Sequence, residues 1–314
     1  MYDWPVRIFK KRETPSQNIA YCGLLLALLC LLSLLLSFLP LLGLFLILLL
    51  PFLTSSIALL CKKRYAIAFT IAATILCPLI GIADWPSVVF YLLPACYAGI
   101  VYGYGLRLNL GDSLTIFLTS LFEALLLLLG VLVARFALNI DLIASLGALV
   151  GLEREKAMLI FPLFSFSYSL GQSALSHFFA IANSAKLGLD NLDSGRLSFL
   201  DPIIALSFIA ISLPLAYFSY MGMANLFFGF ALYFAFYSAR GLWGRKWAAW
   251  IGTSLVLALF LLFAYLASFF PSSALHIVYL SAPIIGISGV DLAYWILGLL
   301  KRKAKAAKPG DDPQ

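Results

Sequence analysis

The sequence predicts an all-α polytopic membrane protein, a bundle of about ten transmembrane helices with both termini in the cytoplasm. Two observations predict this fold class. The chain of 314 residues is 63% hydrophobic and only 11% charged, whereas soluble domains carry about 25% charged residues. Its apolar residues also form long continuous runs rather than short alternating segments, which favours membrane-spanning helices over a barrel.

The apolar runs have roughly the length that a helix needs to cross a bilayer, about 20 residues. Several boundaries between neighbouring runs are weak, so eight or nine spans are the alternatives to ten. In chain order the runs are 19–39, 41–61, 65–83, 87–105, 114–138, 157–182, 203–221, 223–238, 247–270 and 275–300.

The positive charges lie between the runs and indicate the orientation. With ten spans and the N-terminus inside, the inside segments contain 18 of the 21 lysines and arginines, and the outside segments contain three (21 − 18), Arg135, Arg154 and Lys156. The positive-inside rule therefore predicts an even number of spans and cytoplasmic termini. Because the net charge of +7 is concentrated in these gaps, it indicates topology rather than a nucleic-acid partner.

Polar segments divide the chain into five predicted parts. These are a basic cytoplasmic N-terminal segment (1–18), a six-span part (19–182), a cytoplasmic loop (183–202), a four-span part (203–300) and a basic cytoplasmic tail (301–314).

Motifs for common enzymes are missing from the sequence. It contains no G-x-x-x-x-G-K-[ST] phosphate-binding loop, no H-E-x-x-H and no G-x-S-x-G. The chain has only two histidines, and its five cysteines form no C-x-x-C pair. We therefore expect no enzymatic activity, no cofactor and no metal site.

Two acidic residues lie deep within apolar runs. Glu123 is near the middle of run 114–138, and Asp291 lies ten residues before Lys301 (301 − 291), about 15 Å from the charged end of its helix. A carboxylate at this depth costs about 2.5–3.5 kcal/mol or more, so it is usually paired, protonated or in a polar cavity.

A polar stripe marks the run 157–182. Ser165, Ser169, Ser173 and His177 recur every four residues, with Gln172 alongside, which places them on one helix face.

Two hypotheses account for these buried polar residues. In the first, Glu123, Gln172, Ser173, His177 and Asp291 bind a substrate or a proton. In the second, the polar groups only hold helices together, at about 0.6–2 kcal/mol for each interhelical hydrogen bond.

Small residues form two ladders at four-residue spacing, Gly23 with Ala27, and Ala95 with Gly99 and Gly103. Such ladders allow helices to approach closely. The contact is either internal or with a partner subunit, and we hypothesise a partner contact at these five positions.

Three segments resemble a known family. The opening "GLLLALLCLLSLLLSFLPLLGLFLILLLPFLTSSIALLCKKRYAIAFTIAATIL", the glycine-rich "LPACYAGIVYGYGLRLNLGDS" and the closing "IIGISGVDLAYWILGLLKRK" are similar to YybS-like bacterial membrane proteins. That family is in turn distantly similar to the substrate-binding S components of energy-coupling-factor (ECF) vitamin transporters. The middle segment "LEREKAMLIFPLFSFSYSLGQSALSHFF" matches only loosely.

The resemblance implies a multi-pass protein of the bacterial inner membrane with a binding or transport role. Our first hypothesis is a membrane protein that binds a small solute or lipid and relies on a separate ATPase and a coupling membrane subunit. The alternatives are a non-catalytic scaffold for cell-envelope, cell-shape or sporulation assembly, and a proton- or ion-coupled secondary carrier.

Overall fold

The computed structural model describes residues 12–39, 46–183, 198–242 and 246–306, and all regular elements in these ranges are helical. The chain divides into two compact units, 1–196 and 197–314, which are treated separately here. Parts of the predicted N-terminal segment, of the loop 183–202 and of the tail fall outside the described residues; they are 1–11, 184–197 and 307–314.

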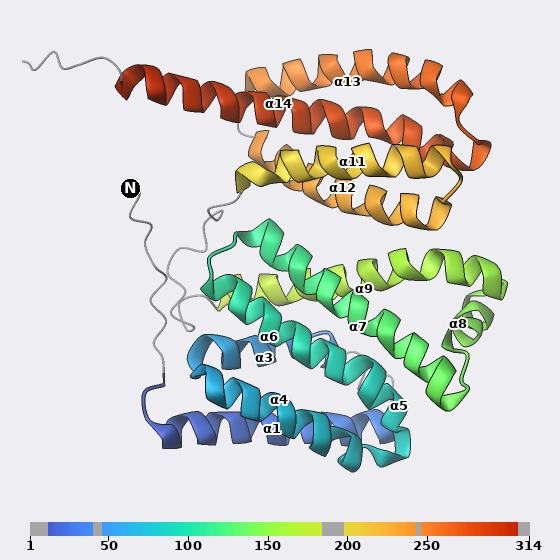
Figure 1. Cartoon of the computed structure of the whole chain (residues 1–314). Coiled ribbons are helices and arrows are strands. Elements are labelled where there is room, and N and C mark those ends of the chain that lie inside the picture. The colour runs from blue at the N-terminus through green and yellow to red at the C-terminus, as the bar shows by residue number, and fades with distance from the viewer. Residues whose placement is uncertain (1–11, 40–45, 184–197, 243–245, 307–314) are drawn as a thin grey trace, which may run out of the picture. The chain divides into compact units, whose positions relative to one another are not determined.

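In its described residues, unit 1 contains seven longer helices and a short irregular stretch (Figure 1). The irregular stretch consists of a 3-10 turn (Ile82–Asp84), α5 (Trp85–Ser87) and a π-helical turn (Val88–Leu92), which lead into α6. The longer helices are α1 (Pro15–Phe38), α3 (Leu50–Leu60), α4 (Lys63–Ile80), α6 (Leu93–Arg107), α7 (Asp112–Leu138), α8 (Leu142–Val150) and α9 (Arg154–Ala182).

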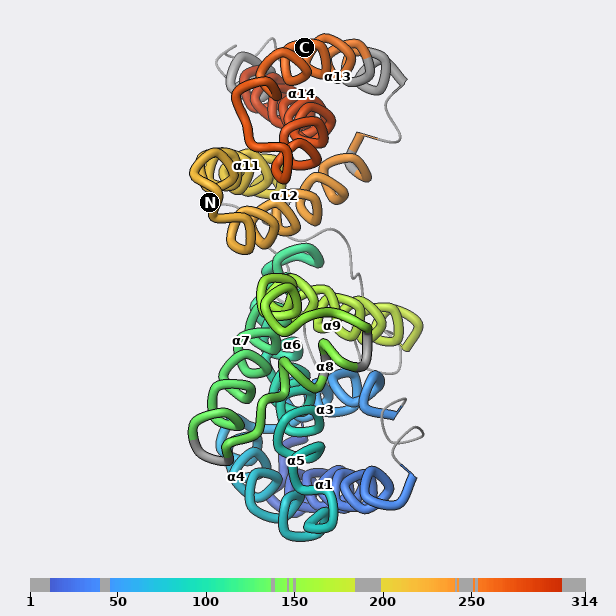
Figure 2. Tube along the Cα trace, turned by 90° about the vertical axis from the view of Figure 1, so that its right-hand side faces the viewer, coloured from blue at the N-terminus to red at the C-terminus, as the bar shows by residue number. Residues whose placement is uncertain are grey.

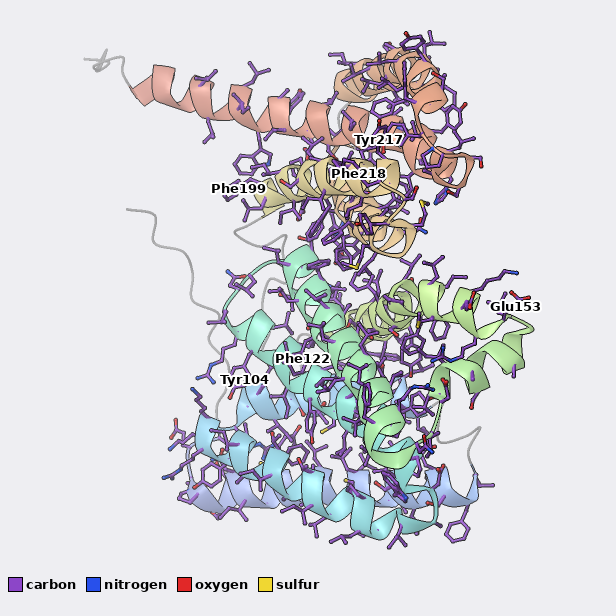
Figure 3. The ribbon with its side chains drawn as sticks, turned by 45° about the vertical axis from the view of Figure 1, so that its right-hand side comes forward. Tyr104, Phe122, Glu153, Phe199, Tyr217 and Phe218 are labelled. Atoms are coloured by element: carbon purple, nitrogen blue, oxygen red, sulfur yellow. The ribbon has the colours of Figure 1, made fainter. Side chains whose placement is uncertain are left out.

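Unit 2 is built from four helices, α11 (Asp201–Tyr217), α12 (Met221–Leu242), α13 (Lys246–Leu266) and α14 (Leu275–Ala306). The helix α14 packs against each of the other three. Aromatic rings fill much of this unit; Phe208, for example, lies 5.2 Å from Phe230 between ring centroids. At the end of α11, Tyr217 makes edge-to-face contacts with Phe218 and Phe270 (Figure 3).

The all-α prediction is confirmed for the described residues, whose regular elements are all helical. The run 41–61 begins outside them and contains α3, and the count of ten spans stays a prediction. Seven of the described helices are long and apolar enough to cross a membrane, and three shorter apolar helices cover 50–60, 201–217 and 254–269. The chain is therefore a multi-pass membrane protein. Alone, α3 with 11 residues is about 16 Å long, roughly half of a hydrocarbon core.

The outer surfaces of the helices are apolar and the polar side chains lie inside. Leu24 is 68% exposed, Phe136 85% and Leu261 75%, whereas Glu123 is only 1% exposed. In water this distribution would leave large apolar patches exposed. In a bilayer it places hydrocarbon against lipid and removes polar groups from it.

Four helices of unit 1 form a closed group. The helix α6 packs on α3 and on α7, α7 packs on α9, and α9 returns to α3. Helices α1 and α4 pack together beside this group (Figure 2). The group consequently buries one face of each of its four members.

The contact between α3 and α6 depends on the second small-residue ladder. Ala95 is fully buried, and a Cβ added at Gly99 would overlap the Thr54 hydroxyl and lie 2.6 Å from Pro51 Cα. A Cβ at Gly103 would lie 2.5 Å from the Ser55 carbonyl oxygen.

The ladder Ala95, Gly99 and Gly103 is therefore buried inside the bundle, with α3 packed against the two glycines. At these positions the contact is internal rather than the hypothesised contact with a partner subunit. Gly23 and Ala27 lie on the exposed side of α1, and a Cβ at Gly23 would meet nothing within 4 Å. A partner contact at these two positions remains a prediction.

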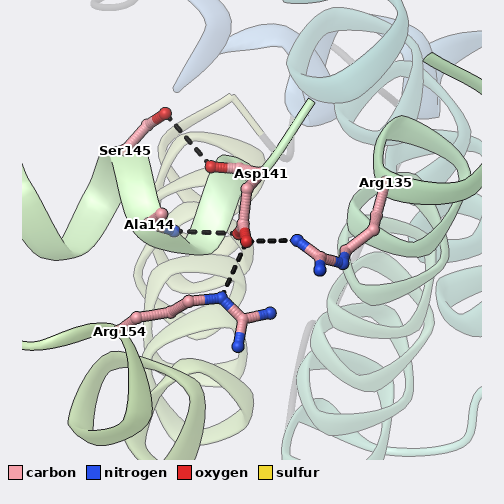
Figure 4. A network of polar contacts seen from close by, with 5 residues as sticks. All are labelled: Arg135, Asp141, Ala144, Ser145 and Arg154. Atoms are coloured by element: carbon pink, nitrogen blue, oxygen red, sulfur yellow. Dashed lines mark hydrogen bonds and ion pairs between the residues drawn. The ribbon is translucent and has the colours of Figure 1, made fainter. Parts of the chain in front are cut away.

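The connection between α7 and α9 contains α8, a helix that the sequence analysis did not identify within 139–156. Asp141 caps its N-terminus by accepting a hydrogen bond from the Ala144 N–H at 3.0 Å. The same carboxylate pairs with Arg135 and, at 2.7 Å, with Arg154 (Figure 4). One side chain thus ties the end of α7 and the start of α9 to α8.

We predict that Gly99→Ala lowers the free energy of unfolding by about 1–3 kcal/mol, the usual penalty of overpacking. The backbone of Pro51 cannot rotate away, so this penalty exceeds the gain in helix propensity of up to about 1 kcal/mol. Thermal or denaturant unfolding of the purified protein in detergent would measure it. Gly23→Ala is the matched control and should be neutral or slightly stabilising; equal stability of both variants would contradict the prediction.

For Asp141, the Ala144 N–H, followed by Arg154, holds the carboxyl pKa below its ordinary value. Because the pKa is lowered by folding, the carboxylate stabilises the fold at pH values above its ordinary pKa of about 3.9. This contribution disappears as the pH falls through the pKa of the folded state. We expect the stability difference between wild type and Asp141→Asn to shrink below about pH 4.

At neutral pH, Asp141→Ala should be less stable than Asp141→Asn, because asparagine retains the capping acceptor and loses only the ion pairs. Thermal unfolding across a pH series would show both effects. Identical behaviour of the two variants would mean that the cap contributes nothing.

Candidate functional site

The candidate site is a set of buried polar residues on two helices that pack together, α7 and α9. Each of them is at most 8% exposed. On each helix they recur at intervals of one, three or four residues, so they share one face. We call this set the polar seam: Asp112, Thr115, Thr119 and Glu123 of α7 with Ser165, Ser169, Gln172, Ser173, Ser176 and His177 of α9.

The two helices run antiparallel (Figure 1), and one contact indicates their register. Asp112 Oδ2 lies 3.7 Å from His177 Nε2. Glu123 lies eleven residues beyond Asp112 along α7 (123 − 112 = 11), a distance of about 16 Å. Between these two positions Phe117 meets Phe166 of α9 edge to face, and Glu123 is close enough to Tyr168 of α9 to interact electrostatically.

The polar residues of α7 run from its first turn to about its middle, and those of α9 run in the opposite direction from His177 to Ser165. Asp112 meets His177 across the two helices. Thr115 lies against α6, because a Cβ added at Gly105 would be 2.8 Å from its Cγ2 atom.

His177 forms the shallow end of the polar seam together with Tyr102 of α6. The Tyr102 hydroxyl and His177 Nδ1 are 2.8 Å apart, and the two rings meet edge to face. When Tyr102 donates to Nδ1, a neutral imidazole carries its proton on Nε2, the nitrogen that faces Asp112. Protonation of the ring would turn the contact between His177 and Asp112 into an ion pair.

Four buried serines of α9 have unpartnered side-chain oxygens, a condition that they share with Ser238 and Ser288 of unit 2. Ser165, Ser169, Ser173 and Ser176 have no hydrogen-bond partner for their side-chain oxygens among the described residues. The usual solution in a membrane helix is to donate to the carbonyl four residues earlier. Several other buried hydroxyls adopt it, with distances of 2.7–3.0 Å: Ser33 to Leu29, Thr54 to Leu50, Thr119 to Thr115, Ser120 to Ile116 and Ser281 to Ile277.

Glu123 forms the deep end of the polar seam. Its Oε2 atom is buried and has no hydrogen-bond partner in the described part of the chain. Most buried side-chain polar atoms in proteins do have one, so each exception calls for an explanation. An unpaired carboxyl oxygen halfway across a bilayer points to function more strongly than a serine does.

Gln172 holds α9 to the chain segment that precedes α3. Its side-chain nitrogen donates to the Ile47 carbonyl at 2.6 Å, over 125 residues of sequence. The amide oxygen, Oε1, is buried without a partner among the described residues. Since the nitrogen is anchored, the orientation of this acceptor is fixed.

Three of the five predicted site residues lie on one helix face, a fourth lies on the helix packed against it, about 16 Å along that helix from the Asp112–His177 contact, and the fifth belongs to unit 2. Gln172, Ser173 and His177 share one face of α9, and Glu123 lies on α7 opposite. Asp291 belongs to α14 in unit 2, where it is 6% exposed. It is not assigned to the polar seam.

The sequence analysis did not single out Asp112, Thr115, Thr119 and Tyr102. The first three are detectable, because they precede Glu123 at intervals of three or four residues in "DSLTIFLTSLFE". Tyr102 carries no such signal, since only the packing of α6 brings its hydroxyl to His177.

The polar seam has two carboxyl groups, one histidine, one amide and a row of hydroxyls, groups that can form hydrogen bonds with a polar or charged ligand. No cluster of three or more His, Cys, Asp or Glu that could hold a metal ion occurs in the described ranges. No protein-family model, curated protein or solved structure matches this chain.

We predict that Tyr102→Phe lowers the free energy of unfolding by about 1–2 kcal/mol, because it leaves His177 Nδ1 buried without its partner. Denaturant unfolding in detergent would measure the change. Tyr104→Phe, the same substitution at a half-buried position of α6, is the control and should change stability by less than about 0.5 kcal/mol. Equal losses in the two variants would show that the Tyr102–His177 contact contributes no stability.

Proposed function

We propose that unit 1 binds a small polar solute along the polar seam and that the protein is the membrane component of a transport system energised by separate subunits. The observation that supports this role most directly is the row of unpartnered buried oxygens between α7 and α9. If these polar groups served only to hold the bundle together, we would expect their oxygens to form hydrogen bonds within it, as the hydroxyls of Ser33 and Ser281 do. A ligand in the membrane interior would need them.

The proposed topology has ten crossings with both termini in the cytoplasm. It adds the three shorter apolar helices to the seven long ones. Asp112 and His177 then lie on the cytoplasmic side, near the turn that follows Arg107, and Glu123 lies near the bilayer midplane. In this orientation the polar seam leads from the cytoplasmic surface halfway into the membrane.

The proposed partners follow from what the chain has and lacks. Without a phosphate-binding loop in its 314 residues, ATP hydrolysis would come from a separate ATPase, joined through a coupling membrane subunit. The exposed small residues Gly23 and Ala27 on α1 are the proposed contact with that subunit, because a helix can approach closely there.

We predict that Glu123→Gln abolishes solute-dependent thermal stabilisation of the detergent-purified protein while the fold is retained. A ligand at 100 times its dissociation constant stabilises by about 2.7 kcal/mol, which a thermal-shift screen of small metabolites would detect. Mass spectrometry of the freshly purified protein would identify a co-purifying solute.

The matched control is Glu153→Gln, which removes the same charge from an exposed residue before α9 (Figure 3) and should leave the solute response unchanged. If no solute stabilises the wild type and only cell-envelope proteins co-purify with it, the scaffold alternative would replace the transport role.

A further inference from the structure

The polar seam has more hydrogen-bond acceptors than donors. All eight of its unpartnered atoms are oxygens, namely Asp112 Oδ1, Thr115 Oγ1, Glu123 Oε2, Ser165 Oγ, Ser169 Oγ, Gln172 Oε1, Ser173 Oγ and Ser176 Oγ. The amide oxygen only accepts, and so do the carboxylate oxygens when ionised. The five hydroxyls can either donate or accept. A ligand that brings positive charge would satisfy the three oxygens that only accept, and the hydroxyls can turn their lone pairs towards it.

Buried carboxyl groups outnumber buried basic groups in the part of the chain that the structure describes. The buried carboxyl and basic side chains there are Asp112, Glu123, Asp201, Asp291 and His177, without a buried lysine or arginine. A site for an anion would need basic side chains or the N-terminus of a helix. The polar seam instead offers Glu123 eleven residues inside α7 (123 − 112), far from that helix terminus.

The charge at the deep end matches a single positive charge. Glu123 is the one carboxyl of the polar seam at this depth, because Asp112 lies about 16 Å away along α7. A divalent ion bound there would keep a net positive charge in a medium of low dielectric constant, at a large cost. A monovalent cation paired with the Glu123 carboxylate leaves the deep end neutral.

The unpartnered atoms at Glu123 on α7 and around Tyr168 on α9 are oxygens, Glu123 Oε2 with Ser165 Oγ and Ser169 Oγ. Carboxylate and hydroxyl oxygens are hard ligands, suited to hard cations rather than to soft metals. An ammonium group could also use the same oxygens, because it donates hydrogen bonds to them.

We propose that the deep end of the polar seam is a monovalent-cation site, with the Glu123 carboxylate supplying the charge and the Ser165 and Ser169 hydroxyls as neutral ligands. This inference rests on the proposed binding role of the same residues and specifies the charge of what binds. The cation is an alkali-metal ion or a small ammonium ion.

The test uses the full-length protein purified in detergent. Thermal stability would be titrated with lithium, sodium, potassium or ammonium chloride, with N-methyl-D-glucamine chloride keeping the ionic strength constant. We expect a saturable stabilisation by at least one of the small cations. Comparing the alkali series with ammonium would distinguish the two kinds of cation.

Variants would locate the site. Glu123→Gln should weaken the apparent affinity for the cation by about 10- to 100-fold, the range expected when a hydrogen bond or contact to a charged group is lost. The double variant Ser165→Ala with Ser169→Ala should weaken it in the same direction. Glu153→Gln and Ser33→Ala, a buried serine that bonds to its own helix, should bind like the wild type. Binding of radioactive sodium or rubidium would provide a second readout that does not depend on unfolding.

The outcomes separate this inference from the proposed function. A response equal in all salts, or unchanged in Glu123→Gln, would overturn the cation site. If a neutral or anionic solute stabilises the wild type and the small cations do not, solute binding stands and the cation site fails. If cations bind through Glu123 and no other solute does, the cation site stands and the proposed solute role fails.

Discussion

The absence of hydrogen-bonding partners in lipid is the constraint on which the rest of this structure depends. Hydrocarbon does not drive apolar side chains inward, so helices associate through close packing and internal polar contacts. The contact between α3 and α6 shows the first, because Gly99 and Gly103 bring two backbones together. The contact between α7 and α9 shows the second, with Asp112 beside His177.

These two contacts have different consequences. The contact at Gly99 and Gly103 leaves no free space between the helices, since even a methyl group there would collide with Pro51 or Ser55. The polar contact leaves oxygen atoms of both helices unpaired. Close packing on one side of the four-helix group thus coexists with unsatisfied polarity on the other. Rigidity and binding capacity are placed on different helix pairs of the same unit.

The buried serines help to distinguish interhelical packing from binding. Some buried serines bond to their own backbone, as Ser33 and Ser281 do, and others, such as Ser238 and Ser288 of unit 2, have no partner among the described residues. The serines of α9 are set apart by their number on one helix face and by their place beside Gln172 and His177. This grouping supports the binding hypothesis for α9, and the absence of buried lysine and arginine side chains in the described ranges indicates the charge of the expected ligand.

The sequence by itself determined the class of protein, the helical runs and the buried stripe on α9, because length, hydropathy and four-residue spacing are local properties. It also marked Glu123 as exceptional. Only the tertiary structure assigned Gly99 and Gly103 to the contact with α3, paired His177 with Tyr102 and Asp112, and assigned Asp291 and Glu123 to different units. Spacing within a helix defines a face, but which helix covers that face depends on contacts between residues that are distant in sequence. These contacts cannot be predicted from a single sequence in which most residues are apolar.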